Sequence, residues 1–330
     1  MSPAALRPAD LKRGDAFELV HGLRDASVQL TVTSPPYNIG KVYEKRVRLS
    51  SYLADFEDFA RVLFKKTSPA GSVCWQVGNY VERGEIYPLD IYFYGIFKDA
   101  GFKLRNRIIW HYGHGLHANH RFSGRYETLL WFTKGSDYVF NLDNVRVPAK
   151  YPGKLHFRGA RRGAPSGDPR GKNPTDFWAD LAARDWESMV WDVPNVKANH
   201  VEKTIHPCQF PVELAERCVL ALSQPRNLVL DPFLGAGSTA VAAALHHRRF
   251  VGFDMDSNYV RLARRRLRSL EDGTLRLRPL GRPVYQPTSG ERVARVPEEW
   301  TVPRSSSGSP PILRMLRAAK GARMVAGGAT

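Results

Sequence analysis

Hydrophobic residues recur along most of the chain in segments that alternate between a helical and a strand-like period. The first unit, residues 16–33, reads as a helix followed by a buried strand that stops at Ser34-Pro35-Pro36. Helical spacing also predicts helices over 52–64, 92–97, 211–222, 238–245 and 258–270. Short apolar runs predict strands over 72–77, 102–110, 128–132, 228–230 and 250–253, with a turn at 68–71. This alternation predicts an α/β fold with a mostly parallel sheet.

Three stretches interrupt the regular pattern. Residues 111–120 are rich in glycine and histidine, and residues 151–175 hold five glycines, four prolines and six basic residues. Beyond residue 270, proline, serine and glycine dominate. We therefore expect four parts: a first half over 11–144, an inserted region over 145–199, a second half over 200–270 and a basic tail over 271–330.

A glycine-rich turn joins the predicted strand 228–230 to the helix 238–245. Its glycines let the backbone approach a ligand closely, and Asp254 ends the next predicted strand, where a carboxylate can accept hydrogen bonds from both ribose hydroxyls. This order predicts a nucleoside site. Gly-Ala-Gly-Ser-Thr-Ala also satisfies the dinucleotide fingerprint in its alanine form, so two cofactor classes stay open here. The candidate cofactor-binding residues of this unit are Asp231, Pro232, Phe233, Gly235, Gly237, Ser238, Thr239 and Asp254.

A second turn, Thr33-Ser34-Pro35-Pro36-Tyr37-Asn38, carries the sharper signal. Consecutive prolines donate no backbone N–H and hold the preceding residue extended, so the local oxygens are left to accept hydrogen bonds. The aromatic ring that follows can stack on a planar substrate. A nucleobase amine is a poor nucleophile until acceptors, here a serine Oγ and a proline carbonyl, draw on its N–H bonds. The corner therefore suits methylation of an exocyclic amine, with Ser34, Pro35, Pro36 and Tyr37 as candidate catalytic residues.

With both turns described, the sequence resembles the amino-group DNA methyltransferases that use S-adenosylmethionine, in the circularly permuted class whose catalytic motif precedes the cofactor motif. Residues 33–37 match the catalytic [SDN]-Pro-Pro-[YF] motif, and residues 231–237 match the Phe-x-Gly-x-Gly cofactor motif. The resemblance spans about residues 10–270. It implies a Rossmann-like methyltransferase fold with an inserted target-recognition region. It also implies that Asp15 contacts the adenine, that Asp254 binds the ribose and that Phe210 lies on the cofactor side.

In this family the first residue of the catalytic motif correlates with the target base, and Ser34 favours cytosine N4 over adenine N6. The resemblance implies direct methyl transfer, without a covalent intermediate, to a cytosine flipped out of the duplex. Other hypotheses stay open: an adenine-N6 or RNA methyltransferase, a dinucleotide-dependent oxidoreductase, and a non-catalytic DNA-binding protein that keeps the fold.

Two further patterns have competing interpretations. Pro207-Cys208-Gln209 spells the nucleophile motif of cytosine-C5 methyltransferases, but in that family the motif follows the glycine turn and here it precedes it. Four histidines recur every third residue between 111 and 120, yet glycines interrupt any helix that would align them as ligands, so no metal is expected. We expect Trp178, Trp186 and Trp191 to pack within the inserted region.

The chain carries 49 Lys and Arg against 32 Asp and Glu, a formal net charge of +17. This surplus favours double-stranded DNA as the partner, and the resemblance adds a cognate restriction endonuclease. Three cysteines without paired spacing, and the lack of a membrane-length apolar run, predict an intracellular protein of a reducing cytoplasm. The resemblance implies that this is the prokaryotic cytoplasm, in association with the nucleoid. The tail is expected to add non-specific DNA contact. The candidate DNA-binding residues are His117, Arg121, Arg158, Arg161, Arg162, Arg170 and Lys172.

Overall fold

The computed structural model describes residues 9–41, 44–112, 117–149, 151–178, 195–196 and 200–280. The predictions for His114, Trp186, Trp191 and residues 281–330 lie outside these ranges. The helices are α1 (Ala16–Leu19), α2 (Leu49–Lys66), α3 (Leu89–Asp99), α4 (Val212–Leu222), α5 (Ser238–Leu245) and α6 (Ser257–Glu271), with short 3₁₀ turns η1 (Val20–Gly22) and η2 (Leu142–Asn144). The strands are β1 (Asp10–Arg13), β2 (Val28–Thr33), β3 (Thr67–Val77), β4 (Asn79–Glu82), β5 (Glu85–Pro88), β6 (Lys103–His111), β7 (Tyr126–Thr133), β8 (Phe177–Trp178), β9 (Leu228–Asp231) and β10 (Arg249–Asp254).

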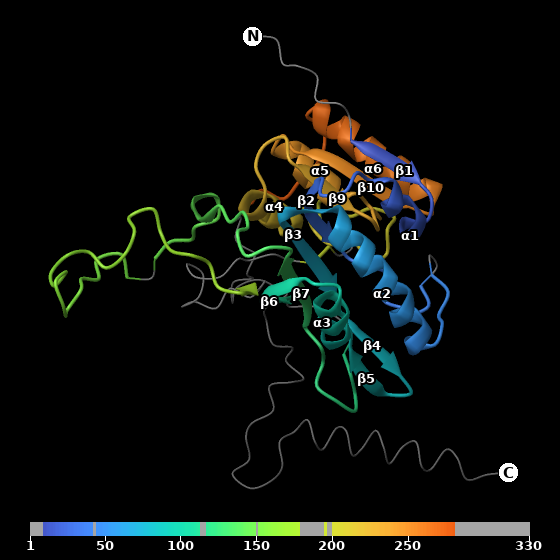
Figure 1. Ribbon diagram of the computed structural model, residues 1–330, viewed down its shortest axis with the longest axis horizontal. Coiled ribbons are helices and arrows are strands. Elements are labelled where there is room, and N and C mark those ends of the chain that lie inside the picture. The colour runs from blue at the N-terminus through green and yellow to red at the C-terminus, as the bar shows by residue number, and fades with distance from the viewer. Residues whose placement is uncertain are drawn as a thin grey trace, which may run out of the picture. The chain divides into compact units, whose positions relative to one another are not determined.

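Eight of the described strands form one sheet in the order β1-β10-β9-β2-β3-β7-β6-β8 (Figure 1). Strands β1, β10, β9, β2 and β3 run parallel to one another, whereas β7 is antiparallel to both β3 and β6. Strand β8 pairs in parallel with β6, and β4 and β5 form a separate hairpin. The prediction of a mostly parallel sheet is confirmed.

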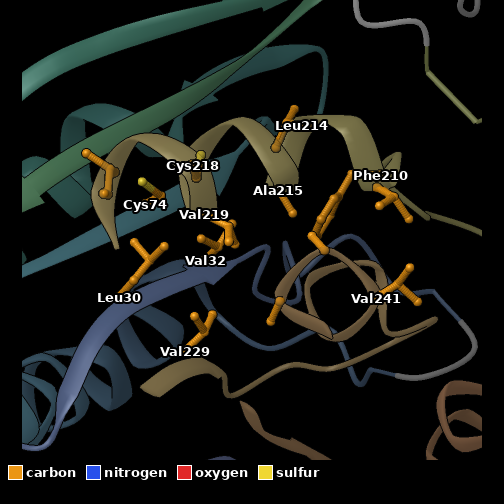
Figure 2. Close-up of a cluster of buried hydrophobic side chains, with 14 of the residues drawn as sticks. Leu30, Val32, Cys74, Phe210, Leu214, Ala215, Cys218, Val219, Val229 and Val241 are labelled. Atoms are coloured by element: carbon orange, nitrogen blue, oxygen red, sulfur yellow. The ribbon is translucent and has the colours of Figure 1, made fainter. Parts of the chain in front are cut away.

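Helices cover both faces of this sheet because side chains of its strands alternate between the two sides. On β7, Leu129 and Trp131 belong to a core shared with α4, α5 and α6, while Leu130 and Phe132 belong to a core shared with α1, α2 and α3. Figure 2 shows the first core, where side chains of α4 lie over those of β2 and β9. Within the described residues, none of the helices combines the length and the apolar character that crossing a bilayer requires.

Most elements predicted from the hydrophobic pattern are confirmed and differ only at their ends, although the first helix is a single turn continued by η1. The turn predicted at 68–71 is wrong, because β3 continues through these residues. The β2–β3 register shifts there: Val28 lies opposite Thr67, but Leu30 lies opposite Ser72. The extra residues bulge out of the ladder, which explains their turn-like composition.

The inserted region folds back on itself in its described part. Val147 bridges to Lys172, and Leu155 bridges to Pro165. Between these bridges, Gly159 and Gly163 take positive φ angles of +73° and +85° and let the chain reverse. The described part of this region therefore has its own backbone pairing. Trp178 is buried in the first core, as expected for a packing residue.

The chain stays attached to the sheet domain after α6 ends. Leu275 and Leu277 pack against the first core. The Arg278 N–H donates to Glu202 Oε1 at 3.2 Å, and its guanidinium pairs with the buried Glu213 carboxylate. The residues up to Arg278 therefore pack on the sheet domain, so the predicted tail over 271–330 begins with residues that belong to this domain.

Candidate active site

The two turns that the sequence predicts as catalytic and cofactor-binding, residues 33–38 and 231–237, lie next to each other at the ends of two paired strands. They follow β2 and β9, which pair in parallel, so both turns lie at the same edge of the sheet. Thr33 Oγ1 donates a 2.6 Å hydrogen bond to Asp231 Oδ1, and Thr239 Oγ1 donates to the Val32 carbonyl at 3.1 Å. The structure thus joins the two turns directly, as the sequence predicts.

A cavity of about 470 Å³ opens between the turns. All four catalytic candidates line it. Asp231, Gly237 and Thr239 are not lining residues, since Asp231 and Thr239 are buried behind the turn and Gly237 caps α5. The volume is in the range of small-ligand sites. The cofactor candidates that do line the cavity are Asp15, Phe210, Pro232, Phe233, Gly235, Ser238 and Asp254.

Neighbouring side chains hold the Ser-Pro-Pro-Tyr corner in one conformation. The Tyr52 hydroxyl of α2 donates to the Pro36 carbonyl at 2.7 Å, and the Asn38 side chain exchanges two hydrogen bonds with the Val47 backbone. Ser34 Oγ donates to the Tyr37 hydroxyl oxygen at 2.9 Å. Because its only proton is directed at Tyr37, Ser34 has lone pairs left to accept from a donor in the cavity.

Sequence reasoning missed three residues at the Tyr37 end of the cavity. Glu127 of β7 accepts the Tyr37 hydroxyl at 3.3 Å and also accepts from Gln76 Nε2 of β3. Exclusion of water from the Glu127 carboxyl raises its pKa to about 7, although the bonds from Tyr37 and Gln76 act in the opposite direction. A Cβ at Gly78 would lie 3.1 Å from Tyr37 Cε2, so glycine makes room for the ring. A single acid or glutamine on a strand forms no local motif, and only the folded chain shows their proximity.

Positive φ angles of +48° at Gly235 and +75° at Gly237 shape the glycine turn. A Cβ at Gly235 would lie 3.0 Å from His206 Nε2, so glycine permits this close approach. The N–H groups of Gly235 and Asp256 each donate at 2.8 Å, one to each oxygen of the Asp254 carboxylate. The helix N-cap of α6 is Asp256 rather than Asp254. Each Asp254 oxygen therefore keeps acceptor capacity for a ligand hydroxyl.

Two more segments line the cavity near Asp254. The Gly14 N–H donates to the Asp254 carbonyl at 3.0 Å, which holds Asp15 beside the end of β10. Asp15 also caps α1 by accepting the Phe17 N–H at 2.9 Å. On the other side, Ser238 Oγ donates to the Phe210 carbonyl at 2.8 Å, which fastens residues 206–211 to α5.

His206 and Cys208 belong to this second segment. Burial, with Lys203 as the smaller cause, lowers the pKa of His206 to about 4, so its ring is neutral near pH 7. The ring contacts Tyr259 edge to face with centroids 4.6 Å apart. Cys208 is a free, exposed thiol that lines the cavity.

The lining fits S-adenosylmethionine. The Asp254 carboxylate lies beside the glycine turn and offers acceptors for ribose hydroxyls. The glycine at position 235 lets a ligand approach the backbone closely. The rings of Phe17 and Phe233 add apolar surface to the same cavity. Nucleoside and apolar parts of one ligand could therefore be held together here.

The DNA-binding candidates lie in two places. His117 and Arg121 are exposed between β6 and β7, next to Phe122, whose side chain is 99% exposed. Arg170, in contrast, already has acidic partners: its guanidinium pairs with Asp168 at 2.8 Å and also with Asp143. Lys172 takes part in the bridge to Val147. The remaining candidates are exposed in the inserted region: Arg158, Arg161 and Arg162.

The fold and this cavity place the chain among the S-adenosylmethionine-dependent methyltransferases. A structure described as a DNA modification methylase from Thermus thermophilus complexed with S-adenosyl-L-methionine matches with a TM-score of 0.53 and 26% identity, covering 80% of this chain and 95% of that one. A cytosine-N4-specific PvuII DNA methyltransferase matches in fold, with a TM-score of 0.58 at 21% identity over 78% and 85% of the two chains. The expected Rossmann-like fold and cofactor are confirmed.

The chain belongs to the N6/N4 DNA methylase family, whose model matches residues 28–265. The type II methyltransferase M.BglII of Bacillus subtilis is 45% identical over 251 residues, 76% of this chain and 66% of that relative. M.ScaI of Streptomyces caespitosus is 35% identical over 78% and 80% of the two chains, and the DNA adenine methyltransferase YhdJ of Escherichia coli (strain K12) is 29% identical over 77% and 81%. Family membership confirms a DNA amino-methyltransferase and removes the oxidoreductase hypothesis.

Proposed function

We propose that this chain methylates the N4 amine of a flipped cytosine in double-stranded DNA, with the catalytic and cofactor motifs in circularly permuted order. The observation that carries the proposal is the state of Ser34. Its hydroxyl donates to Tyr37 at 2.9 Å, and its oxygen lines the cavity next to Pro35. The corner thus offers two acceptors for the two N–H bonds of one amine.

Two acceptors match what a base amine needs in order to react. Its lone pair is delocalised into the ring, and hydrogen bonds to Ser34 Oγ and the Pro35 carbonyl favour a pyramidal nitrogen with an available lone pair. S-adenosylmethionine, when bound, supplies an electrophilic methyl group. Tyr37 would stack on the base, while Tyr52 holds the corner through Pro36. Positioning then accounts for much of the rate.

The cofactor candidates divide into contacts and supports. Asp254 would bind the ribose hydroxyls and Asp15 would lie at the adenine. Pro232, Phe233 and the Gly235 backbone would flank the methionine portion, with Phe210 on the opposite wall. Asp231, Gly237 and Thr239, which do not line the cavity, and Ser238, which does, would be supports, since their hydrogen bonds, caps or burial fix the two turns and the 206–211 segment relative to one another.

Two bases are candidates for the methylation target. Ser34 as the first catalytic residue favours cytosine N4. Adenine N6 is the second candidate, because a relative with 29% identity over 81% of its length is described as a DNA adenine methyltransferase. Both bases present an exocyclic amine next to a ring nitrogen, so the same corner could serve either one.

Partners follow from charge and from the names of the relatives. Residues 145–199 would form the target-recognition region, where Arg158, Arg161 and Arg162 would contact DNA, and Arg121 and His117 would approach phosphates from the β6–β7 segment. Two relatives are named type II methyltransferases, which supports a cognate restriction endonuclease and a place in the prokaryotic cytoplasm.

Base-resolved sequencing of DNA from cells that express the protein tests this proposal. N4-methylcytosine at one recurring sequence supports it, whereas N6-methyladenine would move the assignment to the second candidate. Ser34→Ala should abolish the signal, and Cys208→Ser should leave it, since no thiol adduct is formed. Unmodified DNA from the wild type, with purified protein that binds S-adenosylmethionine, would overturn the proposal.

A further inference from the structure

A continuous line of hydrogen bonds runs from the catalytic corner to a carboxylate on a different strand. Ser34 Oγ–H donates to the Tyr37 oxygen at 2.9 Å, and the Tyr37 O–H donates to Glu127 Oε2 at 3.3 Å. All three side chains line the same cavity. Each donor in this line points away from the place where the amine would bind and toward Glu127.

Glu127, the last residue of this line of hydrogen bonds, is a carboxylate that can accept a proton. Gln76 Nε2 donates to the same Glu127 oxygen, which stabilises the ionised carboxylate and fixes its orientation. The described titratable groups around the line are Tyr112, which hydrogen-bonds to Glu127, and Cys208, which adds to the raised pKa of Tyr37. Exclusion of water, and then Glu127, are the larger causes that raise the pKa of Tyr37, so the phenol carries its proton at neutral pH.

The chemistry at the amine leaves one proton to be placed. When the nitrogen forms its bond to the methyl carbon, it carries one hydrogen too many and a positive charge. One N–H bond must then break, and the nitrogen keeps the electron pair. The proposed function places no base next to the amine except Ser34, whose own oxygen is far too weakly basic to hold the proton.

We propose that Glu127 is the terminal proton acceptor of the methyl-transfer reaction, reached through Ser34 and Tyr37. The amine N–H proton passes to Ser34 Oγ, the Ser34 proton passes to the Tyr37 oxygen, and the Tyr37 proton passes to Glu127 Oε2. Ser34 and Tyr37 end neutral, as they began, and Glu127 ends as the carboxylic acid. Release of the product opens the cavity to water, which takes the proton from Glu127.

This inference rests on the proposed function only in needing an exocyclic amine as the methyl acceptor, so it applies to cytosine N4 and adenine N6 alike. It gives Glu127 a direct chemical role rather than a packing role. It also explains why a tyrosine is useful at position 37, because a phenylalanine could stack on the base but could not pass a proton.

The test is the single-turnover rate of methyl transfer as a function of pH, on an oligonucleotide that contains the mapped target sequence. In the wild type the rate should rise through about pH 7, where the Glu127 carboxyl loses its proton. Glu127→Gln, which keeps the shape and a hydrogen-bond acceptor, should be slower by about 10²-fold at pH 8 and should lose the rise. Tyr37→Phe should give the same flat profile.

A matched control is Glu85→Gln, which breaks a second tyrosine–glutamate pair, the 2.8 Å bond from Tyr87 on the exposed β4–β5 hairpin. It should keep the wild-type rate and profile. For Glu127→Ala, added formate should restore activity with a pH dependence set by its own carboxyl. Affinity for S-adenosylmethionine, measured by calorimetry, should be unchanged in all of these variants.

Two outcomes would overturn the inference while wild-type activity persists: a Glu127→Gln rate equal to that of the wild type, or a lower rate that keeps the wild-type pH profile. The second result would indicate a purely structural role. A wild-type protein that transfers no methyl group to any DNA would instead contradict the proposed function itself, and the two failures are thus distinguishable.

Discussion

Thr33 Oγ1 and Asp231 Oδ1 form a 2.6 Å hydrogen bond between residues 198 positions apart in the chain. The same carboxylate oxygen also accepts the Phe233 N–H at 3.1 Å. One buried acid therefore connects the last residue of β2 to the first turn after β9. This contact therefore helps to fix the position of the Ser-Pro-Pro-Tyr corner relative to the glycine turn.

Removing this contact should lower both stability and turnover. Thr33→Val keeps the shape of the side chain but removes one of the hydrogen-bond donors to the buried Asp231 carboxylate, which should cost about 1–3 kcal/mol in the free energy of unfolding. Urea denaturation measures this value. The matched control is Thr31→Val on the same strand, because Thr31 Oγ1 has no hydrogen-bond partner within the described residues. Equal losses in the two variants would show that the Thr33 bond contributes nothing specific.

Asp231 should also make stability depend on pH. Burial raises its pKa from 3.8 to about 6, so the folded chain binds this proton more tightly than the unfolded chain does. The stabilisation is full below about pH 4 and is lost as the pH rises through about 6. Relative to Asp231→Asn, the wild type should lose up to ~3 kcal/mol between pH 4 and pH 7. Parallel stability curves for the two proteins would contradict this assignment.

Asp254 and Asp256 offer a test of the cofactor cradle, because both are acids near the end of β10 but only one lines the cavity. Asp254→Asn removes the charge and one acceptor, and should weaken S-adenosylmethionine binding by about 10–100-fold in calorimetry. Asp256→Asn keeps a good helix N-cap for α6 and should bind almost as the wild type does. A similar loss in both variants would argue for a general disturbance of the strand end.

The sequence is sufficient to predict the two turns and their meeting, because each has a local signature that physics constrains. Two consecutive prolines after an apolar run favour the end of a strand, and glycines between a strand and a helix favour a tight turn. Once helices and strands alternate, parallel pairing brings such turns to one edge. The α/β fold and the Ser34 and Gly235 ends of the cavity follow from these rules.

Other features of the fold and of the site have no local sequence signature that could predict them. Strand β1 buries only Leu11 of its four residues, so its pattern resembles a polar loop, and it exists because β10 offers an edge for pairing. Gln76 and Glu127 are single polar residues on two strands whose pairing brings them together. Charge alone predicts Arg170 as a DNA contact. Asp168 lies only two residues away, but Asp143, the second acid that pairs with Arg170, is 27 positions away and no local pattern connects the two.

The inserted region gives a last prediction about DNA. Arg158, Arg161 and Arg162 are exposed, whereas Arg170 is held by two carboxylates. A counterion-release argument then predicts that replacing the first three with Gln lowers the slope of log K against log salt by about 3 units if each contacts a phosphate. Arg170→Gln should leave the slope unchanged, because an arginine already neutralised by Asp143 and Asp168 releases few counterions from DNA. Fluorescence anisotropy from about 50 to 300 mM salt measures both slopes, and an unchanged slope in the triple variant would remove these arginines from the DNA interface.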